Sequence, residues 1–258
     1  MPRFAANLTM LFNEVDFLDR FAAAAAAGFR AVEYLFPYGY DKDRLAGKLA
    51  ENGLSQVLHN LPAGDWAAGD RGLACLPGRV GEFQDGVGRA IDYARALGCP
   101  RVNCLAGIAP DGADRDALRR TFVDNLRFAA RELDKAGIVL LTEPINTRDI
   151  PGFYLNRSDQ ALAIIAEVGS ANLKLQYDVY HMQIMEGDLA PTIERNLAQI
   201  GHMQIADTPG RHEPGTGEIN YGFLFDFIDA CGYDGWIGCE YKPRATTEAG
   251  LEWLAPYL

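Results

Sequence analysis

Short apolar runs alternate with longer amphipathic segments along the whole chain. The apolar runs have the composition of buried strands, and they begin near Phe4, Ala31, Leu54, Arg101, Ile138, Leu173, Gly201 and Gly235. Segments with helical periodicity lie between them, among them residues 16–27, 79–97, 115–136 and 158–168. Several of these segments end at a glycine in the position of a helix C-cap, as in RALGC, DKAGI and AEVGS. The pattern therefore predicts eight units of a strand followed by a helix.

Eight such units favour a single (β/α)8 TIM barrel that takes up residues 1–258. A barrel of this kind typically needs ~250 residues, or about 30 for each unit. A doubly wound open sheet is the competing architecture, and its glycine-rich nucleotide turn would follow the first strand. The chain reads NLTMLFNEVD at that point, without a GxGxxG motif. We therefore expect a barrel, and we expect no nucleotide cofactor.

Each predicted strand ends in a side chain that can take part in chemistry. These strand-end residues are Asn7, Glu33, His59, Asn103, Glu143, Asp178, Gln204 and Glu240. Active sites of (β/α)8 barrels lie at the C-terminal ends of the strands, so we expect these side chains to surround one site. Strand alternation places Gly238 on the same face as Glu240, where its small size leaves room for a ligand near the barrel axis.

Four of these side chains have the chemistry of a divalent-cation site. Glu143, Asp178, Gln204 and Glu240 end or lie within the runs IVLLTE, LKLQYD, HMQIAD and GWIGCE. Carboxylate and amide oxygens are hard ligands that suit Mg²⁺ or Mn²⁺, whereas zinc usually recruits histidine or cysteine. For any one acid alone, a salt bridge at a strand end or a helix cap is an equally good explanation. The convergence of all four favours a metal site.

Composition excludes several classes of function. The chain has 258 residues and is 48% hydrophobic, which is enough for a large core. Its net charge of -11 argues against a nucleic-acid partner, because affinity for phosphates comes from clustered lysine and arginine. Its five cysteines are odd in number and form no CxxC pair, which argues against a disulfide framework or a zinc ribbon. The start has no signal-like region and the alanine run at 22–27 is too short to span a bilayer, so we expect a cytoplasmic protein without a membrane partner.

Five longer segments resemble one known family. They are HNLPAGDWAAGDRG (59–72), EPIN followed by DIPGF (143–153), QYDVYHMQ (176–183), HMQIADTPGRHEPGTGEINY (202–221) and GCEYKP (238–243). In these segments the chain is similar to the hydroxypyruvate isomerases, a family of the xylose-isomerase-like barrel superfamily. The resemblance covers essentially the whole chain.

The resemblance implies an activity and roles for four residues. Glu143, Asp178, Gln204 and Glu240 are implied to bind the metal, and Glu143 and Glu240 are also implied to be the proton-transfer pair. Related sugar epimerases usually carry histidine at the position of Gln204, which leaves the identity of the metal open. The implied reaction interconverts hydroxypyruvate and tartronate semialdehyde through an enediolate, with the cation stabilising the developing negative charge. The expected substrate is a small hydroxy-oxo-acid, and the residue types do not separate hydroxypyruvate from a longer acid such as 2-oxo-tetronate.

Four further residues are candidates for binding the substrate. By resemblance, His181 contacts a substrate oxygen or shuttles a proton; the alternative is a solvent-facing residue at a helix start. His59 either lines the pocket or serves as a core or capping residue. Arg211 and Lys242 follow two of the predicted strands, and each can supply the cation that a substrate carboxylate needs; the alternative for each is a solvated surface charge. The remaining two histidines are expected elsewhere, His202 in the core and His212 in an exposed loop.

Aromatic residues in the predicted rim loops leave two readings open. Arg71 either closes over the pocket with Trp66 of the same loop, which would exclude water, or is a solvated surface charge. Phe12, Phe36 and Tyr38 either cover the substrate or form the contact of a homo-oligomer. The residue types do not separate these readings.

Three other functions are compatible with a barrel. A sugar isomerase or 3-epimerase would use the same metal and carboxylate pair on a neutral ketose. A metal-dependent endonuclease of the same superfamily would need several histidines for a zinc cluster, and this chain has four in all. A catalytically silent binding protein would not need both Glu143 and Glu240. The acid isomerase therefore remains the preferred reading.

Overall fold

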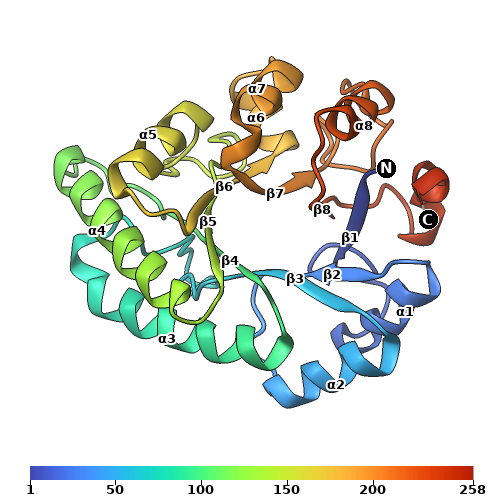
Figure 1. Ribbon diagram of the computed structural model, residues 1–258, viewed down its shortest axis with the longest axis horizontal. Coiled ribbons are helices and arrows are strands. Elements are labelled where there is room, and N and C mark those ends of the chain that lie inside the picture. Colours follow the sequence, from blue (N-terminus) through green and yellow to red (C-terminus); the bar gives the residue numbers. More distant parts are fainter. Residues whose placement is uncertain (258) are drawn as a thin grey trace.

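The computed structural model describes residues 1–257 and has a closed parallel barrel at its centre. The strands are β1 (Arg3–Asn7), β2 (Ala31–Glu33), β3 (Ser55–Asn60), β4 (Arg101–Cys104), β5 (Val139–Thr142), β6 (Leu173–Asp178), β7 (Ile200–Ile205) and β8 (Trp236–Cys239). Each pairs with the next in parallel, and β8 pairs with β1. Each strand begins within one residue of its predicted start. The predicted (β/α)8 barrel is confirmed (Figure 1).

Helices surround the barrel on the outside (Figure 1). They are α1 (Arg20–Ala26), α2 (Lys42–Asn52), α3 (Val80–Leu97), α4 (Arg115–Asp134), α5 (Ser158–Val168), α6 (Val179–Met185), α7 (Leu189–Asn196) and α8 (Tyr221–Ala230). The segment predicted at 16–27 is divided into a 3-10 turn at Phe17–Asp19 and α1, whereas α5 has its predicted bounds. Gly98 and Gly169 cap α3 and α5 in the left-handed conformation, as their positions predicted. Within residues 1–257 no helix is both long and apolar enough to cross a membrane.

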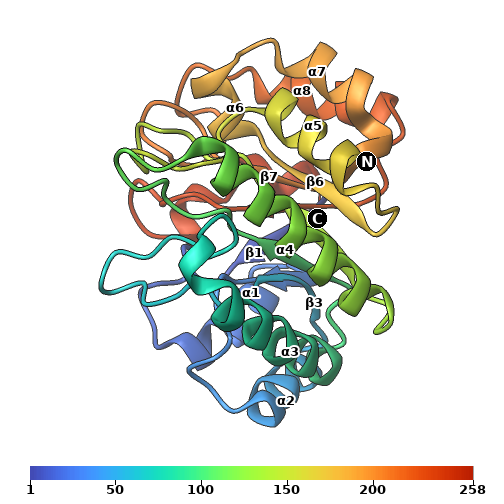
Figure 2. The same ribbon diagram turned by 90° about the vertical axis from the view of Figure 1, so that its left-hand side faces the viewer.

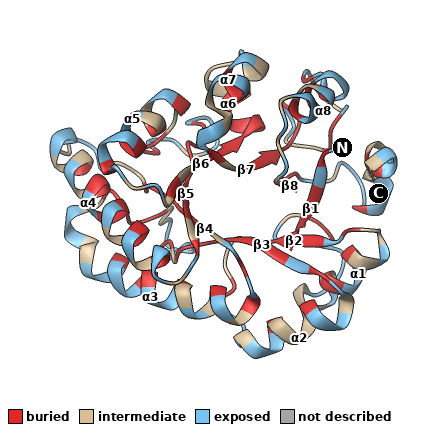
Figure 3. Cartoon of the chain, viewed as in Figure 1, coloured by how far each residue is buried: buried red, intermediate tan, exposed pale blue. Residues whose placement is uncertain are grey.

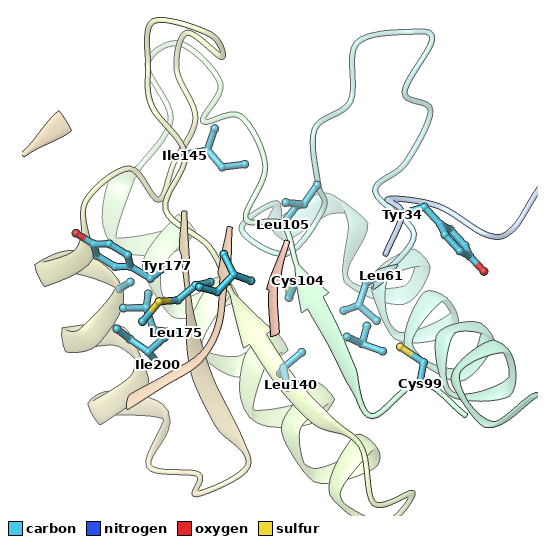
Figure 4. Packing of buried hydrophobic residues seen from close by; sticks show 14 of the residues in the cluster. Tyr34, Leu61, Cys99, Cys104, Leu105, Leu140, Ile145, Leu175, Tyr177 and Ile200 are labelled. Atoms are coloured by element: carbon cyan, nitrogen blue, oxygen red, sulfur yellow. The ribbon is translucent and has the colours of Figure 1, made fainter. Parts of the chain in front are cut away.

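The core has two layers, one on each face of the strands. Leu140, Leu175 and Ile200 belong to the large outer layer, which packs between the barrel and the helices (Figure 4). A smaller layer fills the barrel interior and consists of Ala5, Ala31, Val57, Leu58 and Leu141, with Val139 and Trp236 against it. Adjacent residues of β5 therefore point to opposite layers, as strand alternation requires. In Figure 3 the buried residues follow the strands and the inner faces of the helices.

The interior changes from apolar to polar toward the C-terminal ends of the strands. Glu143 follows Leu141 on the same face of its strand, so it lies above the apolar layer. Long connections that follow β3, β4 and β5 extend from this end of the barrel, at the left of Figure 2. This polar end contains the candidate site.

Candidate active site

Three strands bring together a compact group of buried acids. Glu143 follows β5, Asp178 ends β6 and Glu240 follows β8. Together with His181 from α6, each offers one ligand atom, and these four atoms all lie within 4.8 Å of one another. The His181 Nε2 atom lies 3.9 Å from Glu143 Oε1 and 3.8 Å from Asp178 Oδ2. The structure thus brings together four of the predicted site residues.

Asp178 has two different oxygens, one used by the backbone and one without a partner. Its Oδ1 accepts hydrogen bonds from the backbone N–H groups of Tyr180 and His181, at 2.8 and 3.2 Å, and so caps the start of α6. Its Oδ2 is buried and has no hydrogen-bond partner among the described residues. A buried carboxylate oxygen without a partner is costly, and a cation beside it would remove that cost. Capping of α6 thus explains the position of Oδ1 but not the burial of Oδ2 without a partner.

The acids strongly perturb one another's protonation. Burial raises the pKa of Glu143 well above its usual range, and the charges of Glu240 and Asp178 raise it further. Burial also raises the pKa of Glu240 to about 8, against the opposing effect of Arg211. The pKa of Asp178 is raised to about 6, again mainly by burial. Without a cation the group therefore retains protons at neutral pH, and a divalent cation would replace them.

Gln204, the fourth predicted ligand, lies beside the acids within a hydrogen-bond network. Its Oε1 accepts a bond of 2.6 Å from Gln176 Nε2, which also donates to Glu143 Oε2 at 3.0 Å. Its Nε2 donates to Glu33 Oε1 at 2.7 Å. The amide oxygen is therefore directed to the side of Glu143, where a ligand is needed. An amide oxygen and three carboxylates, among them the one with the unpaired Asp178 oxygen, fit a hard divalent cation.

His181 has its ring orientation determined by Asn146. The Asn146 oxygen accepts from the Asp149 backbone N–H at 2.7 Å, so its amide nitrogen faces His181 Nδ1 at 2.6 Å and donates to it. Burial and the positive charge of Arg211 lower the pKa of His181 well below its usual range, so the ring is neutral at neutral pH. A neutral ring whose Nδ1 accepts carries its proton on Nε2. This tautomer turns an N–H donor toward the acids and favours contact with an oxygen over metal ligation.

Arg211 is held against the acids from several directions. Its Nη2 donates to Glu240 Oε2 at 2.8 Å, and its Nη1 lies 3.6 Å from Asp149 Oδ2. Its guanidinium carbon lies 5.0 Å from the centre of the Tyr180 ring. Burial opposes the charge of Arg211, but Glu240 and Asp178 outweigh that effect and raise its pKa. A positively charged side chain is therefore present where the sequence predicted one for the substrate carboxylate.

The loop that carries Arg211 is organised by Asp207, which the sequence did not single out. Asp207 is buried, and its two carboxylate oxygens accept hydrogen bonds from four backbone N–H groups. These donors are Thr208, Gly215, Gly217 and Ile219, at 2.9, 3.0, 2.8 and 3.1 Å. A Cβ atom at Gly217 would overlap the Thr208 carbonyl oxygen, so only glycine fits there. The loop's shape thus depends on Asp207.

Two predicted substrate-binding residues lie elsewhere. His59 is fully buried, its Nδ1 lies 3.1 Å from the Asn60 carbonyl oxygen, and its ring packs edge-on against Tyr38. Burial lowers the pKa of His59 to about 4. Lys242 is exposed and lines a separate surface hollow with Met10, Asn13 and Glu14, and among the described residues its ammonium has no ion-pair partner. The structure therefore joins neither residue to the acids.

The loop after β3 contains the predicted Arg71 and Trp66 pair. The guanidinium carbon of Arg71 lies 4.1 Å from the centre of the Trp66 ring, and Arg71 also donates to the Trp66 carbonyl oxygen at 3.0 Å. Trp66 is 38% exposed and packs against Phe36. These contacts tie the loop to itself and to the loop after β2. Closure over the site remains a prediction.

Beneath the acids lies a set of buried polar side chains that sequence reasoning partly missed. It consists of Asn7, Glu33, Asn103, Gln176 and His202. His202 lies in the core, as expected, with its Nε2 2.7 Å from Glu33 Oε2. Gln176 and His202 each precede a predicted ligand by two positions on a strand, so alternation was the signal that could have identified the set. Gly238 provides space here as predicted, but a protein carboxylate, that of Glu33, uses it.

Comparison with known proteins agrees with this arrangement. The family model described as xylose isomerase-like TIM barrel matches residues 21–257. A hydroxypyruvate isomerase from Escherichia coli K12 is 59% identical over 257 residues, covering 100% of both chains. A 2-oxo-tetronate isomerase from Cupriavidus necator is 58% identical over 258 residues, covering 100% of this chain and 99% of that one.

A solved structure extends the comparison to three dimensions. It is described as an AP endonuclease, family 2, from Brucella melitensis, and it is 50% identical with a TM-score of 0.98. It covers 100% of this chain, and 99% of that chain is matched. Because these matches span the full length at high identity, the chain belongs to the xylose isomerase-like TIM barrels and, within them, to the hydroxypyruvate isomerase family.

Proposed function

We propose that this enzyme interconverts hydroxypyruvate and tartronate semialdehyde. The observation that carries the proposal is the pair Glu143 and Glu240, two buried carboxylates with raised pKa values in one group. Groups of this kind suit general acid–base catalysis near neutral pH. Arg211, bonded to Glu240, supplies a positive charge for an acidic substrate.

The reaction needs one proton to move between adjacent carbons and no external oxidant. One carboxylate removes a proton from C3 of hydroxypyruvate, and the electrons form the C2=C3 bond of an enediolate. The second carboxylate delivers a proton to C2, while the hydroxyl proton at O3 passes to O2 and O3 becomes the aldehyde oxygen. Glu143 and Glu240 serve as this pair. His181, with its proton on Nε2, donates a hydrogen bond to a substrate oxygen during the transfer between O3 and O2.

A divalent cation, Mg²⁺ or Mn²⁺, fits the oxygen-rich part of the group. Glu143, Asp178, Gln204 and Glu240 would hold it. When bound, it would supply electrostatic stabilisation of the negative charge that develops on the substrate oxygens. The unpaired Oδ2 of Asp178 and the mutual repulsion of the acids support this assignment.

Arg211 would bind the substrate carboxylate. Its planar guanidinium can form two parallel hydrogen bonds with a carboxylate, and Asp149 and Tyr180 hold it in place. Lys242 and His59 remain candidates for weaker roles, since their contacts lie outside the acid group.

Proton NMR of hydroxypyruvate in D₂O tests the proposal. Wild-type enzyme, enzyme with EDTA and the Glu143→Gln variant are compared, because hydroxypyruvate also enolises spontaneously. We expect tartronate semialdehyde to form faster with the active enzyme than with the variant. Equal rates of tartronate semialdehyde formation by enzyme and variant would reject hydroxypyruvate as the substrate.

A longer substrate is the second candidate. A relative named as a 2-oxo-tetronate isomerase has almost the same identity as one named as a hydroxypyruvate isomerase, 58% against 59%. Both acids have a carboxylate for Arg211 and a neighbouring carbonyl. Measuring kcat/KM for both with the same preparation decides between them. A ratio above about tenfold, equivalent to 1.4 kcal/mol, would identify the preferred acid.

The name of the Brucella protein calls for a test of DNA cleavage as well. The net charge of this chain is -11, and His59, His202 and His212 have partners outside the acid group. These features favour a small acid over DNA. Retention on heparin at physiological salt, together with cleavage of DNA that contains an abasic site, would favour the endonuclease.

A further inference from the structure

The carboxylate of Glu33 lies inside the barrel next to Gln204, and the proposed reaction gives it no role. It is only 1% exposed. Its Oε1 accepts hydrogen bonds from Asn7 Nδ2 at 2.9 Å and from Gln204 Nε2 at 2.7 Å. Its Oε2 lies 2.7 Å from His202 Nε2. Three strands other than its own, β1 and β7 through these partners and β8 through close packing, therefore define its position.

The fold reserves space for this carboxylate. A Cβ atom at Gly238 of β8 would overlap both oxygens and the carboxyl carbon of Glu33. Any other residue at position 238 would displace the Glu33 carboxylate. The close approach of the Glu33 carboxylate thus explains the glycine.

An ionised carboxylate accepts hydrogen bonds and donates none, whereas an amide does both. Gln204 Nε2 donates to Glu33 Oε1 at 2.7 Å, so the Gln204 amide turns its nitrogen to Glu33 and its oxygen away. On that opposite side, Gln176 Nε2 donates to Gln204 at 2.6 Å and to Glu143 at 3.0 Å. Because the Gln176 amide nitrogen donates to both the Gln204 and the Glu143 oxygens, the Gln204 oxygen lies on the side of the acid group.

We propose that Glu33 is a positioning residue that sets which end of the Gln204 amide faces the cation. The inference rests on the proposed function, in which Gln204 is a metal ligand. With the amide reversed, two N–H donors would face the cation and repel it. Partners of metal ligands commonly change metal affinity about 10–100-fold when they are altered.

Four proteins test this inference by Mn²⁺ affinity, measured from the electron paramagnetic resonance signal of free Mn²⁺. They are the wild type, Glu33→Gln, Gln204→Glu and the double variant with both changes. Glu33→Gln puts an amide next to an amide, so the orientation is no longer determined, and we expect at least tenfold weaker binding. The double variant exchanges the two chemical groups, so the new amide at 33 donates to the new carboxylate at 204. Adding Gln204→Glu to Glu33→Gln should therefore increase Mn²⁺ affinity by a larger factor than adding Gln204→Glu to the wild type.

A purely electrostatic role for Glu33 gives a different result. Each change of charge would then act independently, and the effects of the two substitutions on affinity would multiply. Multiplication to within about twofold would overturn the inference, as would equal affinities of wild type and Glu33→Gln. If Glu33→Gln does not fold, the double variant compared with Gln204→Glu still tests it, because a carboxylate at position 204 has no amide orientation to set: binding at least tenfold weaker in the double variant overturns the inference.

Glu186→Gln is the matched control. Glu186 accepts hydrogen bonds from the backbone N–H and hydroxyl of Ser158 at 2.6 and 2.7 Å and lies outside the network. Its substitution should leave Mn²⁺ affinity unchanged. If the wild type itself binds no Mn²⁺, both the proposed cation site and this inference are wrong. If the wild type binds Mn²⁺ and Glu33→Gln binds it equally well, only this inference is wrong.

Discussion

Arg211 donates a hydrogen bond of 2.8 Å to Glu240. The side chain proposed to bind the substrate carboxylate is therefore paired with a side chain proposed to transfer the proton. A substrate acid that binds Arg211 would share it with Glu240. Asp149 and Tyr180 hold the guanidinium from other sides, which keeps it in place during that exchange. Recognition of the acid and the proton transfer therefore meet at one side chain.

Replacing Arg211 should weaken binding of an acid selectively. Hydrogen bonds to charged groups are worth about 1.5–3 kcal/mol, so Arg211→Ala should raise KM for hydroxypyruvate roughly 10–150-fold. For uncharged dihydroxyacetone the change should be much smaller. Arg211→Lys, which keeps the charge but loses the planar pair of donors, should fall between wild type and Arg211→Ala. Steady-state kinetics on both compounds check this, and equal effects on the two would reject a carboxylate role.

Asp207→Asn should disturb the loop that presents Arg211. Asparagine has one acceptor oxygen in place of two, so it cannot serve all four backbone N–H groups that Asp207 now binds. A buried donor without a partner costs about 1–3 kcal/mol, so we expect a lower free energy of unfolding by urea. KM for the acid should rise, with Mn²⁺ affinity unchanged.

The control for this prediction is Asp114→Asn. Asp114 caps α4 through the backbone N–H groups of Asp116 and Ala117, and asparagine caps helices about as well as aspartate. The control should therefore keep both stability and KM. A stability loss in Asp207→Asn without any change in KM would make Asp207 purely structural.

Strand periodicity identified the acids because it determines which face a side chain occupies. Glu143 and Leu141 lie two residues apart on the inner face, and the apolar pattern of the strand shows this without a structure. His59 was assigned to the rim because β3 was expected to end there, but β3 ends at Asn60. A difference of one residue reverses the face, so Asn60 bonds to Asn103 and His59 packs against Tyr38.

Contacts across the barrel could not be read from the sequence. Glu33 and Gln204 are 171 residues apart, and nothing local in either strand indicates that they meet. The same holds for Gly238, whose small size suggested space for a ligand, whereas the Glu33 carboxylate fills that space. Lys242 lies beyond the end of β8, where alternation no longer predicts direction. The direction of a side chain could therefore be predicted within a strand, but less well in a loop or where a contact with a distant residue determines it.

Cation binding should strengthen as pH rises toward 8. The pKa of Glu240 is raised to about 8 in the cation-free protein, so it keeps its proton at pH 7, and a cation must displace it. At pH values below that pKa, each displaced proton makes the apparent Mn²⁺ affinity increase about tenfold for every unit by which the pH rises. Titration with Mn²⁺ at pH 6.5, 7.0, 7.5 and 8.0 checks this. The Glu240→Gln variant should have a shallower pH dependence, and identical slopes would contradict the prediction.

The stability of the cation-free protein should change in the opposite direction. A carboxyl with a raised folded pKa stabilises the fold fully below its unfolded pKa of about 4.3, and this contribution is lost as pH rises through the folded pKa. Between pH 7 and 8 the free energy of unfolding in EDTA should therefore fall, by roughly 1 kcal/mol for each retained proton. Restricting the range to pH 7–8 avoids the opposite effect of His181, whose lowered pKa acts below about 6.5. Urea unfolding with and without Mg²⁺ measures this, and added Mg²⁺ should abolish the decline.

Glu143→Gln and Glu240→Gln should each abolish net turnover, because the reaction needs a base at C3 and another at C2. Neither change should unfold the protein, since glutamine has nearly the size and shape of the protonated acid that burial and the neighbouring acids favour. The partial reactions then assign the two roles. In D₂O, the variant that keeps the C3 base should still exchange the C3 protons of hydroxypyruvate without forming product. The other variant should exchange only the C2 proton of tartronate semialdehyde. Exchange at both carbons by either variant would mean that one carboxylate serves both carbons, and the two-base assignment would be wrong.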